Sequence, residues 1–344
     1  RRISYRPLLA LGRSTGGHGR MNEDLLRVSD LRVSFRVGGL SARLAGRATE
    51  IEAVSGVSFT LQRGSTFALV GESGSGKTTL ARTLNGLQPV KAGTIVFEGQ
   101  ELQGLSNAAM KPVRRRMPMM FQDPVGSLSP RLSVRSLLSE PFVIHGLSDR
   151  DLNAEVTRLL ALVGLPRDLA DRYPHQLSGG QARRVGVARA IALDPVLVVA
   201  DEPTAGLDVS VQGEVLNLLN DLRDRMGLSM LIITHNLHVV RQIADRMAVM
   251  YLGRFVEQGE TEAIFRAPHH PYTAALLSAN PEPDPDRVHQ RITLPADVPS
   301  LLARPSGCEF HTRCPQAEGR CALDVPVPAS VGDSRLTCHF PLNT

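Results

Sequence analysis

The spacing of hydrophobic residues changes several times along the chain, and each spacing predicts a different kind of element. Residues 25–35 and 51–61 are rich in Val, Phe, Thr and Ile near period two, which predicts two strands of an antiparallel layer. Residues 196–200 and 230–234 are apolar throughout, as expected for strands buried on both faces of a parallel sheet. Residues 38–50, between the first two strands, are interpreted as a loop.

In two other stretches the hydrophobic residues recur at helical spacing. Leucines recur at this spacing over residues 80–87, which predicts a short helix ending near Gly86. Residues 134–193 repeat Leu and Val in the same way and predict a helical subdomain, whose last helix begins within residues 177–181 and runs to about Ala192. Strands combined with helices of this kind indicate the α/β class.

Charge and hydropathy limit the classes of protein that the sequence fits. The formal charge of +5 comes from the five arginines of residues 1–20, which contain no acid, so the chain from Met21 onward is formally neutral. A basic groove for nucleic acid is therefore not indicated. We interpret residues 1–20 as a disordered or artefactual extension. No apolar run is long enough to cross a bilayer, so a membrane role would need a partner.

Proline becomes frequent beyond Gly259. This density predicts that residues 261–344 form an irregular C-terminal extension, rather than another wound sheet, after a main domain over residues 21–260. The extension contains all four cysteines of the chain. With no export signal in the sequence, we expect a reducing compartment and no disulfides.

Residues 71–78 match the phosphate-loop pattern G-x-x-x-x-G-K-[ST], between an apolar strand and a helical pattern. The glycines allow backbone angles at which successive N–H groups point at phosphate oxygens, beside the positive end of a helix. Lys77 would reach the outer phosphates, and Thr78 would hold magnesium. The alternative is a glycine turn that binds nothing. The candidate nucleotide-binding residues here are Gly71, Glu72, Ser73, Gly74, Ser75, Gly76, Lys77, Thr78 and Thr79.

Acidic and imidazole side chains follow the two buried strands. Asp201 and Glu202 come at the end of the first, and His235 follows the second. Active sites of open parallel sheets gather outside the carboxyl ends of their strands, so we expect these residues near the phosphate loop. Asp201 can hold magnesium through water, while Glu202 can take a proton from attacking water. The alternative for the acidic pair is a helix N-cap and a solvated carboxylate.

Five motifs, in order along residues 25–259, resemble those of ATP-binding cassette (ABC) proteins. They are the Q-loop glutamine Gln122, the signature Leu177-Ser178-Gly179-Gly180-Gln181, the segment after Walker B Asp201-Glu202-Pro203-Thr204, the D-loop Ala205-Gly206-Leu207-Asp208 and the switch histidine His235. The resemblance implies the P-loop NTPase fold of ABC ATPases, with a mixed-sheet core, an antiparallel β layer and a helical subdomain. The Pro- and Cys-rich extension follows this fold.

In that family two cassettes face each other, and ATP lies between the phosphate loop of one and the signature of the other. The resemblance therefore implies ATP and Mg²⁺ as ligands. It makes Glu202 the general base, with Lys77, Gln122 and His235 completing the catalytic set. Mg²⁺ would be held by Thr78, Gln122 and Asp201. The nucleotide of the partner would be contacted by Ser178, Gly179, Gly180, Gln181 and Asp208. Phe35 either stacks on adenine or belongs to the core.

The extension resembles that of oligopeptide, dipeptide and nickel importer ATPases. The resemblance lies in residues 270–278, 305–308 and 311–315. It implies a subunit that hydrolyses ATP to power uptake, at the cytoplasmic face of the inner (plasma) membrane. The implied partners are a second ABC ATPase subunit, usually a non-identical one, two transmembrane permease subunits and an extracytoplasmic substrate-binding protein, with no nucleic acid. The alternative is a soluble ABC-type mechanical ATPase acting on nucleic acid or ribosomes.

The cysteines of the extension suit a soft metal centre, since they lie near glycines and prolines. Their spacing lacks the C-x-x-C of common zinc ribbons, although zinc stays an alternative. The resemblance to importer ATPases favours a [4Fe-4S] cluster over zinc. Its ligands would be Cys308, Cys314, Cys321 and Cys338. A further alternative is four reduced thiols that pack as small apolar side chains.

Overall fold

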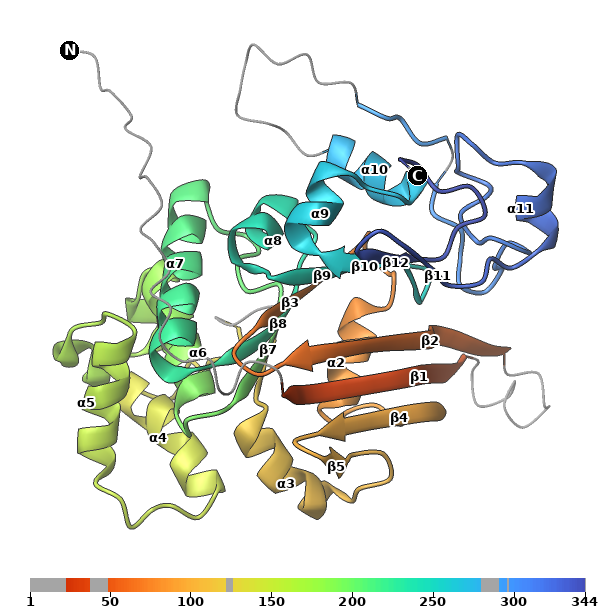
Figure 1. Ribbon diagram of the computed structural model, residues 1–344. Helices are drawn as coiled ribbons and strands as arrows, with labels where there is room; N and C mark the ends of the chain where they lie inside the picture. Colours follow the sequence, from red (N-terminus) through yellow and green to blue (C-terminus); the bar gives the residue numbers. More distant parts are fainter. Residues whose placement is uncertain (1–22, 38–48, 122–125, 280–290, 296, 344) are drawn as a thin grey trace, which may run out of the picture.

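The computed structural model places two sheets side by side, with helices around them (Figure 1). The residues that it describes are 23–37, 49–121, 126–279, 291–295 and 297–343. The predictions for residues 1–20, for most of the loop at 38–50 and for Gln122 fall outside this part of the chain. Within it, no helix combines the length and the apolar character that crossing a bilayer requires.

The smaller sheet is the antiparallel layer. Its strands are β1 (Asp24–Val37), β2 (Thr49–Gln62), β4 (Ala92–Phe97) and β5 (Gln100–Glu101), in the order β2-β1-β4-β5. The two long strands extend one or two residues beyond their predicted bounds. Alternation along β1 buries Leu26 and Val28, while Arg27 between them is exposed. This layer shares one hydrophobic core with the larger sheet.

The larger sheet is mixed and has the strand order β11-β12-β10-β9-β3-β8-β7-β6. Its first six strands along the chain are β3 (Thr66–Val70), β6 (Met119–Met120), β7 (Leu197–Asp201), β8 (Ser229–Ile233), β9 (Arg246–Tyr251) and β10 (Arg254–Glu260). From β9 to β6 neighbouring strands run parallel, and β10 is antiparallel to β9. Every residue of β3, β7 and β8 is buried, as the continuous apolar runs predict.

Helices cover this sheet and build the helical subdomain. Between the strands of the main domain lie α2 (Lys77–Leu84), α3 (Asn107–Arg116), α7 (Val209–Met226) and α8 (Leu237–Ile243). The subdomain contains α4 (Val134–Ile144), α5 (Leu152–Leu162) and α6 (Gly179–Ile191), which lie together at the side remote from the extension (Figure 1). Ser133, Asp151 and Ser178 accept backbone N–H groups at the starts of these three helices.

The C-terminal extension contains regular elements, and one of its strands pairs with the larger sheet. It contains α9 (Thr261–Arg266), α10 (Pro271–Ser278), α11 (Gly319–Leu323), β11 (Ala329–Val331) and β12 (Ser334–Leu336). The β11–β12 hairpin pairs with β10 and so lengthens the larger sheet. To the irregular region that the proline content predicts, the structure adds these short elements. Strand β12 is held by pairing with β10 and β11 by pairing with β12, and strands of three residues leave no repeat in the sequence.

Candidate active site at the phosphate loop

Three neighbouring strands end at one edge of the larger sheet. There β3 leads into the phosphate loop, β7 ends at Asp201, and β8 is followed by His235. A cavity of about 540 Å³ opens at this edge. It is lined by residues 73–79, Ala53, Glu202, Ala205, Ile233, His235 and Leu301. The phosphate loop, Glu202 and His235 thus meet at this edge, as the strand-end rule predicts.

The phosphate loop needs glycine at two points of close contact. A Cβ atom on Gly71 would lie 2.2 Å from the Met250 carbonyl oxygen. At Gly76 the φ angle is +105°, and a Cβ atom would lie 2.3 Å from the Ala53 carbonyl oxygen. Both positions therefore exclude a side chain, which lets the loop backbone pack directly against neighbouring strands.

Lys77 lies at the centre of the loop and is buried. Its Nζ donates hydrogen bonds to the carbonyl oxygens of Gly71 and Glu72, both at 2.8 Å, and to Ser75 Oγ at 3.1 Å. Burial lowers the pKa of Lys77, while the carboxylates of Glu202 and Asp201 act in the opposite direction. The ammonium group is thus held inside the loop, where phosphate oxygens are stronger acceptors than carbonyls.

Asp201 lies buried beside Thr78, which lines the cavity. The Thr78 hydroxyl donates to the Asp201 carboxylate, which is only 2% exposed. Burial raises the pKa of Asp201, and among the described residues its Oδ1 atom has no hydrogen-bond partner. A buried carboxylate oxygen without a partner, beside a hydroxyl, fits Mg²⁺, which prefers hard oxygen ligands and keeps several waters.

Glu202 and His235 both line the cavity and contact each other. The Glu202 Oε1 and His235 Nδ1 atoms are 2.7 Å apart. The Glu202 side chain is 12% exposed, whereas that of His235 is 68% exposed. This arrangement gives a carboxylate at the phosphate cavity that can accept a proton, next to an imidazole that can reach a bound ligand.

No residue of the signature lines this cavity, and of the D-loop Ala205 lines it while Asp208 does not. Ser178 accepts the Gln181 N–H at 3.2 Å, and its own N–H donates to Gln181 Oε1 at 3.0 Å, so the two residues form a capping box at the start of α6. Ser178 and Gly179 are exposed. Asp208 caps α7 by accepting the Val211 N–H at 2.9 Å. The nucleotide roles of these residues stay predictions.

Phe35 also lies away from the cavity lining. Its side chain is partly buried and packs against the core shared by the two sheets. This contact fits the core alternative, and stacking on adenine stays a prediction.

The structure adds residues that the sequence analysis missed. Arg183 on α6 donates to the carbonyl oxygens of Pro203 and Ala205, in the turn after Glu202. Leu301, from the extension, lines the phosphate cavity. Tyr272 and Arg313 contact Glu72 in the phosphate loop. The sequence gives no local signal for these contacts, since they join segments far apart along the chain.

The four thiols of the extension are free and lie near one another. Burial raises the pKa of Cys308 and Cys314, and raises that of Cys338 to about 11, with neighbouring thiols adding to each shift. The described residues nevertheless contain no group of three or more His, Cys, Asp or Glu side chains arranged to hold a metal. The thiols as placed therefore do not fit a cluster or a zinc ion.

Comparisons with known proteins agree with this site. Residues 54–205 match the model of the ABC transporter family, and residues 256–321 match the oligopeptide/dipeptide transporter C-terminal region. A relative from Sinorhizobium fredii, named as a probable peptide ABC transporter ATP-binding protein, is 44% identical over 93% of this chain and 90% of its own length. One from Brucella ovis, with the provisional name of peptide import ATP-binding protein, is 47% identical over 84% of this chain and 92% of its own.

Solved structures give the same fold. CbiO1 from Clostridium perfringens, part of an ABC transporter complex, matches 71% of this chain and 92% of its own with a TM-score of 0.61 and 30% identity. The ATP-binding cassette MJ0796, in a dimeric post-hydrolysis state with ADP and Pi, matches 69% of this chain and 98% of its own with a TM-score of 0.60. At 23% identity the second likeness shows the fold alone. Both the family expected from the motifs and its mixed α/β fold are confirmed: the chain belongs to the ATP-binding proteins of the ABC transporter family.

Proposed function

We propose that the chain is the ATP-binding and ATP-hydrolysing subunit of an ABC importer for peptides. The phosphate site carries this proposal, because Lys77 and Glu202 line its cavity and the buried Asp201 lies beside Thr78 at the same sheet edge. The names of the relatives and the match over residues 256–321 support peptides as the cargo class. No observation favours the soluble alternative, since the charge from Met21 onward is neutral.

The geometry indicates how the residues divide the work. Lys77 and the loop N–H groups bind the β- and γ-phosphates. Thr78 and Asp201 would hold Mg²⁺, which when bound neutralises charge on the phosphate oxygens. Glu202 orients the attacking water and accepts its proton on a carboxylate oxygen, while His235 reaches the γ-phosphate from the exposed side.

We further infer that the site is completed by a second cassette. Ser178 and Gly179, at the start of α6, are exposed and do not line the phosphate cavity of their own chain, and a helix start of this kind can bind an anion. A second chain can place its phosphate loop against this helix start.

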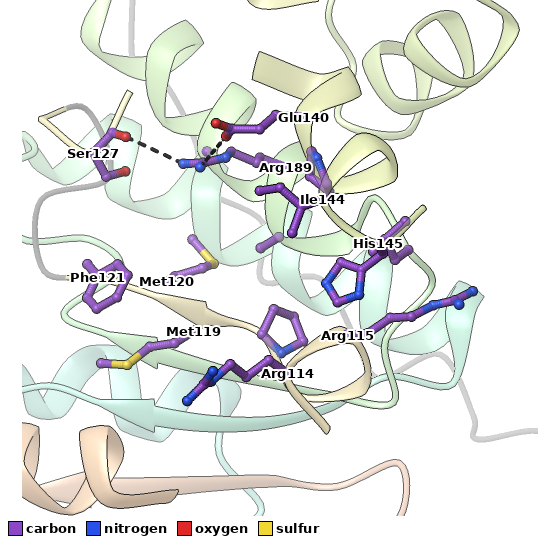
Figure 2. A pocket seen from close by; sticks show the side chains of 15 residues that line it. Arg114, Arg115, Met119, Met120, Phe121, Ser127, Glu140, Ile144, His145 and Arg189 are labelled. Carbon is purple, nitrogen blue, oxygen red and sulfur yellow. Dashed lines mark hydrogen bonds and ion pairs between the residues drawn. The ribbon is translucent and has the colours of Figure 1, made fainter. Parts of the chain in front are cut away.

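The contact with permease subunits is proposed at a smaller cavity of about 220 Å³ beside the helical subdomain. Figure 2 shows Met119 and Phe121 across this cavity from Ile144 on α4. Phe121 is 45% exposed and Ile144 is 52% exposed, and Arg115 adds a positive charge. A cavity that combines exposed apolar side chains with charged ones suits a short cytoplasmic segment of a membrane protein, and Phe121 directly precedes Gln122 in the chain.

Co-purification tests the proposal. The tagged chain, expressed with the membrane proteins encoded beside it, should purify with permease subunits. An Ile144→Asp variant should lose them while the isolated chain still binds ATP. Leu323→Asp, at an 81% exposed position of α11, is the matched control and should keep them. Purification with nucleic acid or ribosomes, and with no membrane subunit, would favour the alternative instead.

A metal centre in the extension stays a separate proposal, which rests on the presence of four free cysteines and on the family resemblance, while the thiols as placed form no metal-holding group among the described residues. Anaerobic purification tests it. Iron with visible absorbance would support a [4Fe-4S] cluster, and zinc alone would support a zinc site. A colourless protein with neither metal would leave four reduced thiols.

A further inference from the structure

The C-terminal extension holds the second residue of the phosphate loop. Arg313 makes a two-pronged ion pair with Glu72, with Nη1 at 2.7 Å from Oε2 and Nη2 at 3.1 Å from Oε1. Arg313 is buried, and its guanidinium lies 5.9 Å from the centre of the Tyr251 ring at the end of β9. Such a paired fork fixes the carboxylate in direction as well as in distance.

Tyr272, on α10 of the extension, holds the same residue at two more points. Its hydroxyl accepts the Glu72 backbone N–H at 3.0 Å and donates to Glu72 Oε2 at 3.2 Å. The ring is fully buried and packs against Tyr251 and Phe310, with ring centres 4.8 and 5.3 Å away. The hydroxyl therefore has little freedom to move away from the loop.

The remaining polar atom of Glu72 faces the catalytic lysine. Its carbonyl oxygen accepts hydrogen bonds from Lys77 Nζ at 2.8 Å and from the Ser75 N–H at 3.3 Å. The extension thus contacts the side chain and the N–H group of Glu72, while the carbonyl oxygen of Glu72 accepts a hydrogen bond from Lys77. A second contact lies nearby, where Arg304 donates to the Glu52 carbonyl beside the cavity-lining Ala53.

We propose that Arg313 and Tyr272 are positioning residues for ATP, which act through Glu72 on the phosphate loop and so on Lys77. The inference rests on ATP binding at this loop. The extension would then position the phosphate loop for ATP, besides pairing with the edge of the larger sheet. Neither side chain lines the cavity, so their effect passes through the loop backbone.

Equilibrium binding of a fluorescent ATP analogue to the full chain tests this inference. Arg313→Gln should weaken binding by about ten- to a hundredfold, the worth of a charge-assisted hydrogen bond. Tyr272→Phe keeps the ring packing and should have a smaller effect. Because Arg313 and Glu72 act as a unit, the double variant Arg313→Gln/Glu72→Gln should lose less affinity than the two single changes combined.

A matched control and a measure of folding separate positioning from stability. Arg241→Gln removes the exposed ion pair between Arg241 and Glu262, in which Nε lies 3.3 Å from Oε1. This change should leave ATP affinity unchanged. Arg313→Lys keeps the positive charge but cannot make the two parallel hydrogen bonds of a guanidinium. It replaces Arg313→Gln in the binding measurement if that variant does not fold. A folded Arg313 variant with the unfolding midpoint lowered but ATP affinity intact would overturn the inference. Failure of the wild-type chain to bind ATP would instead overturn the proposed function.

Discussion

The Nδ1 atom of His235 lies 2.7 Å from Oε1 of Glu202, so two side chains that follow neighbouring buried strands form one hydrogen-bonded unit. Glu202 has a φ angle of +54°, and its N–H donates to the Ile233 carbonyl at 2.8 Å. Non-glycine residues in this region of backbone space are uncommon and concentrate at functional sites. The turn aims the carboxylate at the phosphate cavity and leaves the imidazole exposed.

Glu202→Gln should lower ATP turnover by roughly 10²- to 10⁴-fold, the usual worth of a general base, because the amide cannot accept the proton of the attacking water. ATP affinity should be retained. Steady-state hydrolysis and equilibrium binding measure the two quantities. Glu214→Gln removes an exposed carboxylate paired with Arg184 at 2.9 Å and should change neither. Near-normal hydrolysis by Glu202→Gln would contradict the assignment.

Asp201→Asn should raise the Mg²⁺ concentration needed for half-maximal hydrolysis by about tenfold or more, because it removes the buried negative charge beside Thr78. A Mg²⁺ titration of ATP turnover measures the change. Asp221→Asn, in an exposed pair 2.7 Å from Arg225 on α7, is the control. An unchanged Mg²⁺ requirement in Asp201→Asn would rule out this residue as a contributor to the metal site.

Gly76→Ala should weaken ATP binding more than about tenfold, since its Cβ would lie 2.3 Å from a backbone oxygen and the φ angle is +105°. Gly213→Ala is the counterpart within α7, where nothing lies within 4 Å of the added Cβ. It should stabilise the chain by about 0.5–1 kcal/mol, because alanine is the better helix former. Nucleotide titration and urea unfolding check the pair. Normal ATP binding by Gly76→Ala would show that the loop does not need this close packing.

The stability of the chain should fall as pH drops through the range set by His270. This imidazole is 1% exposed and caps α10, and burial lowers its pKa to about 3. The unfolded chain, with an ordinary His pKa of about 6.5, takes up a proton that the folded chain refuses, so the stability contribution is complete above that value and is lost toward pH 3.

Between pH 7 and pH 5 the wild type should therefore lose about 2 kcal/mol more than His270→Asn, whose side-chain oxygen can still cap the helix. Urea unfolding at the two pH values measures the difference. Equal losses in both proteins would show that His270 does not control this pH dependence.

The parts of the fold that could be predicted are those that depend on residues close together in the sequence. A strand buried on both faces needs a continuous apolar run, which is why residues 196–200 and 230–234 predicted β7 and β8 within one residue. The phosphate loop is equally local, because its glycines, Lys77 and Thr78 are adjacent in the chain. The strand-end rule then placed Asp201 and His235 beside it.

The parts that could not be predicted depend on contacts between distant segments. Glu72 and Arg313 are separated by 241 positions, and no periodicity of either segment records their ion pair. Tyr272 stood out only through a family resemblance, which gave no contact. The β11–β12 hairpin is similar, because its position depends on pairing with β10 and its strands are too short to show alternation.

The most direct test of the account is ATP turnover per chain, measured over a range of protein concentrations alongside the oligomeric state by sedimentation. The phosphate cavity is lined by Lys77 and Glu202, whereas the exposed Ser178 and Gly179 at the start of α6 do not line it. The isolated chain should therefore bind ATP, hydrolyse it poorly when monomeric, and gain turnover as it pairs or meets a second cassette. Full turnover that is independent of concentration, by a chain shown to be monomeric, would contradict a site shared between two cassettes.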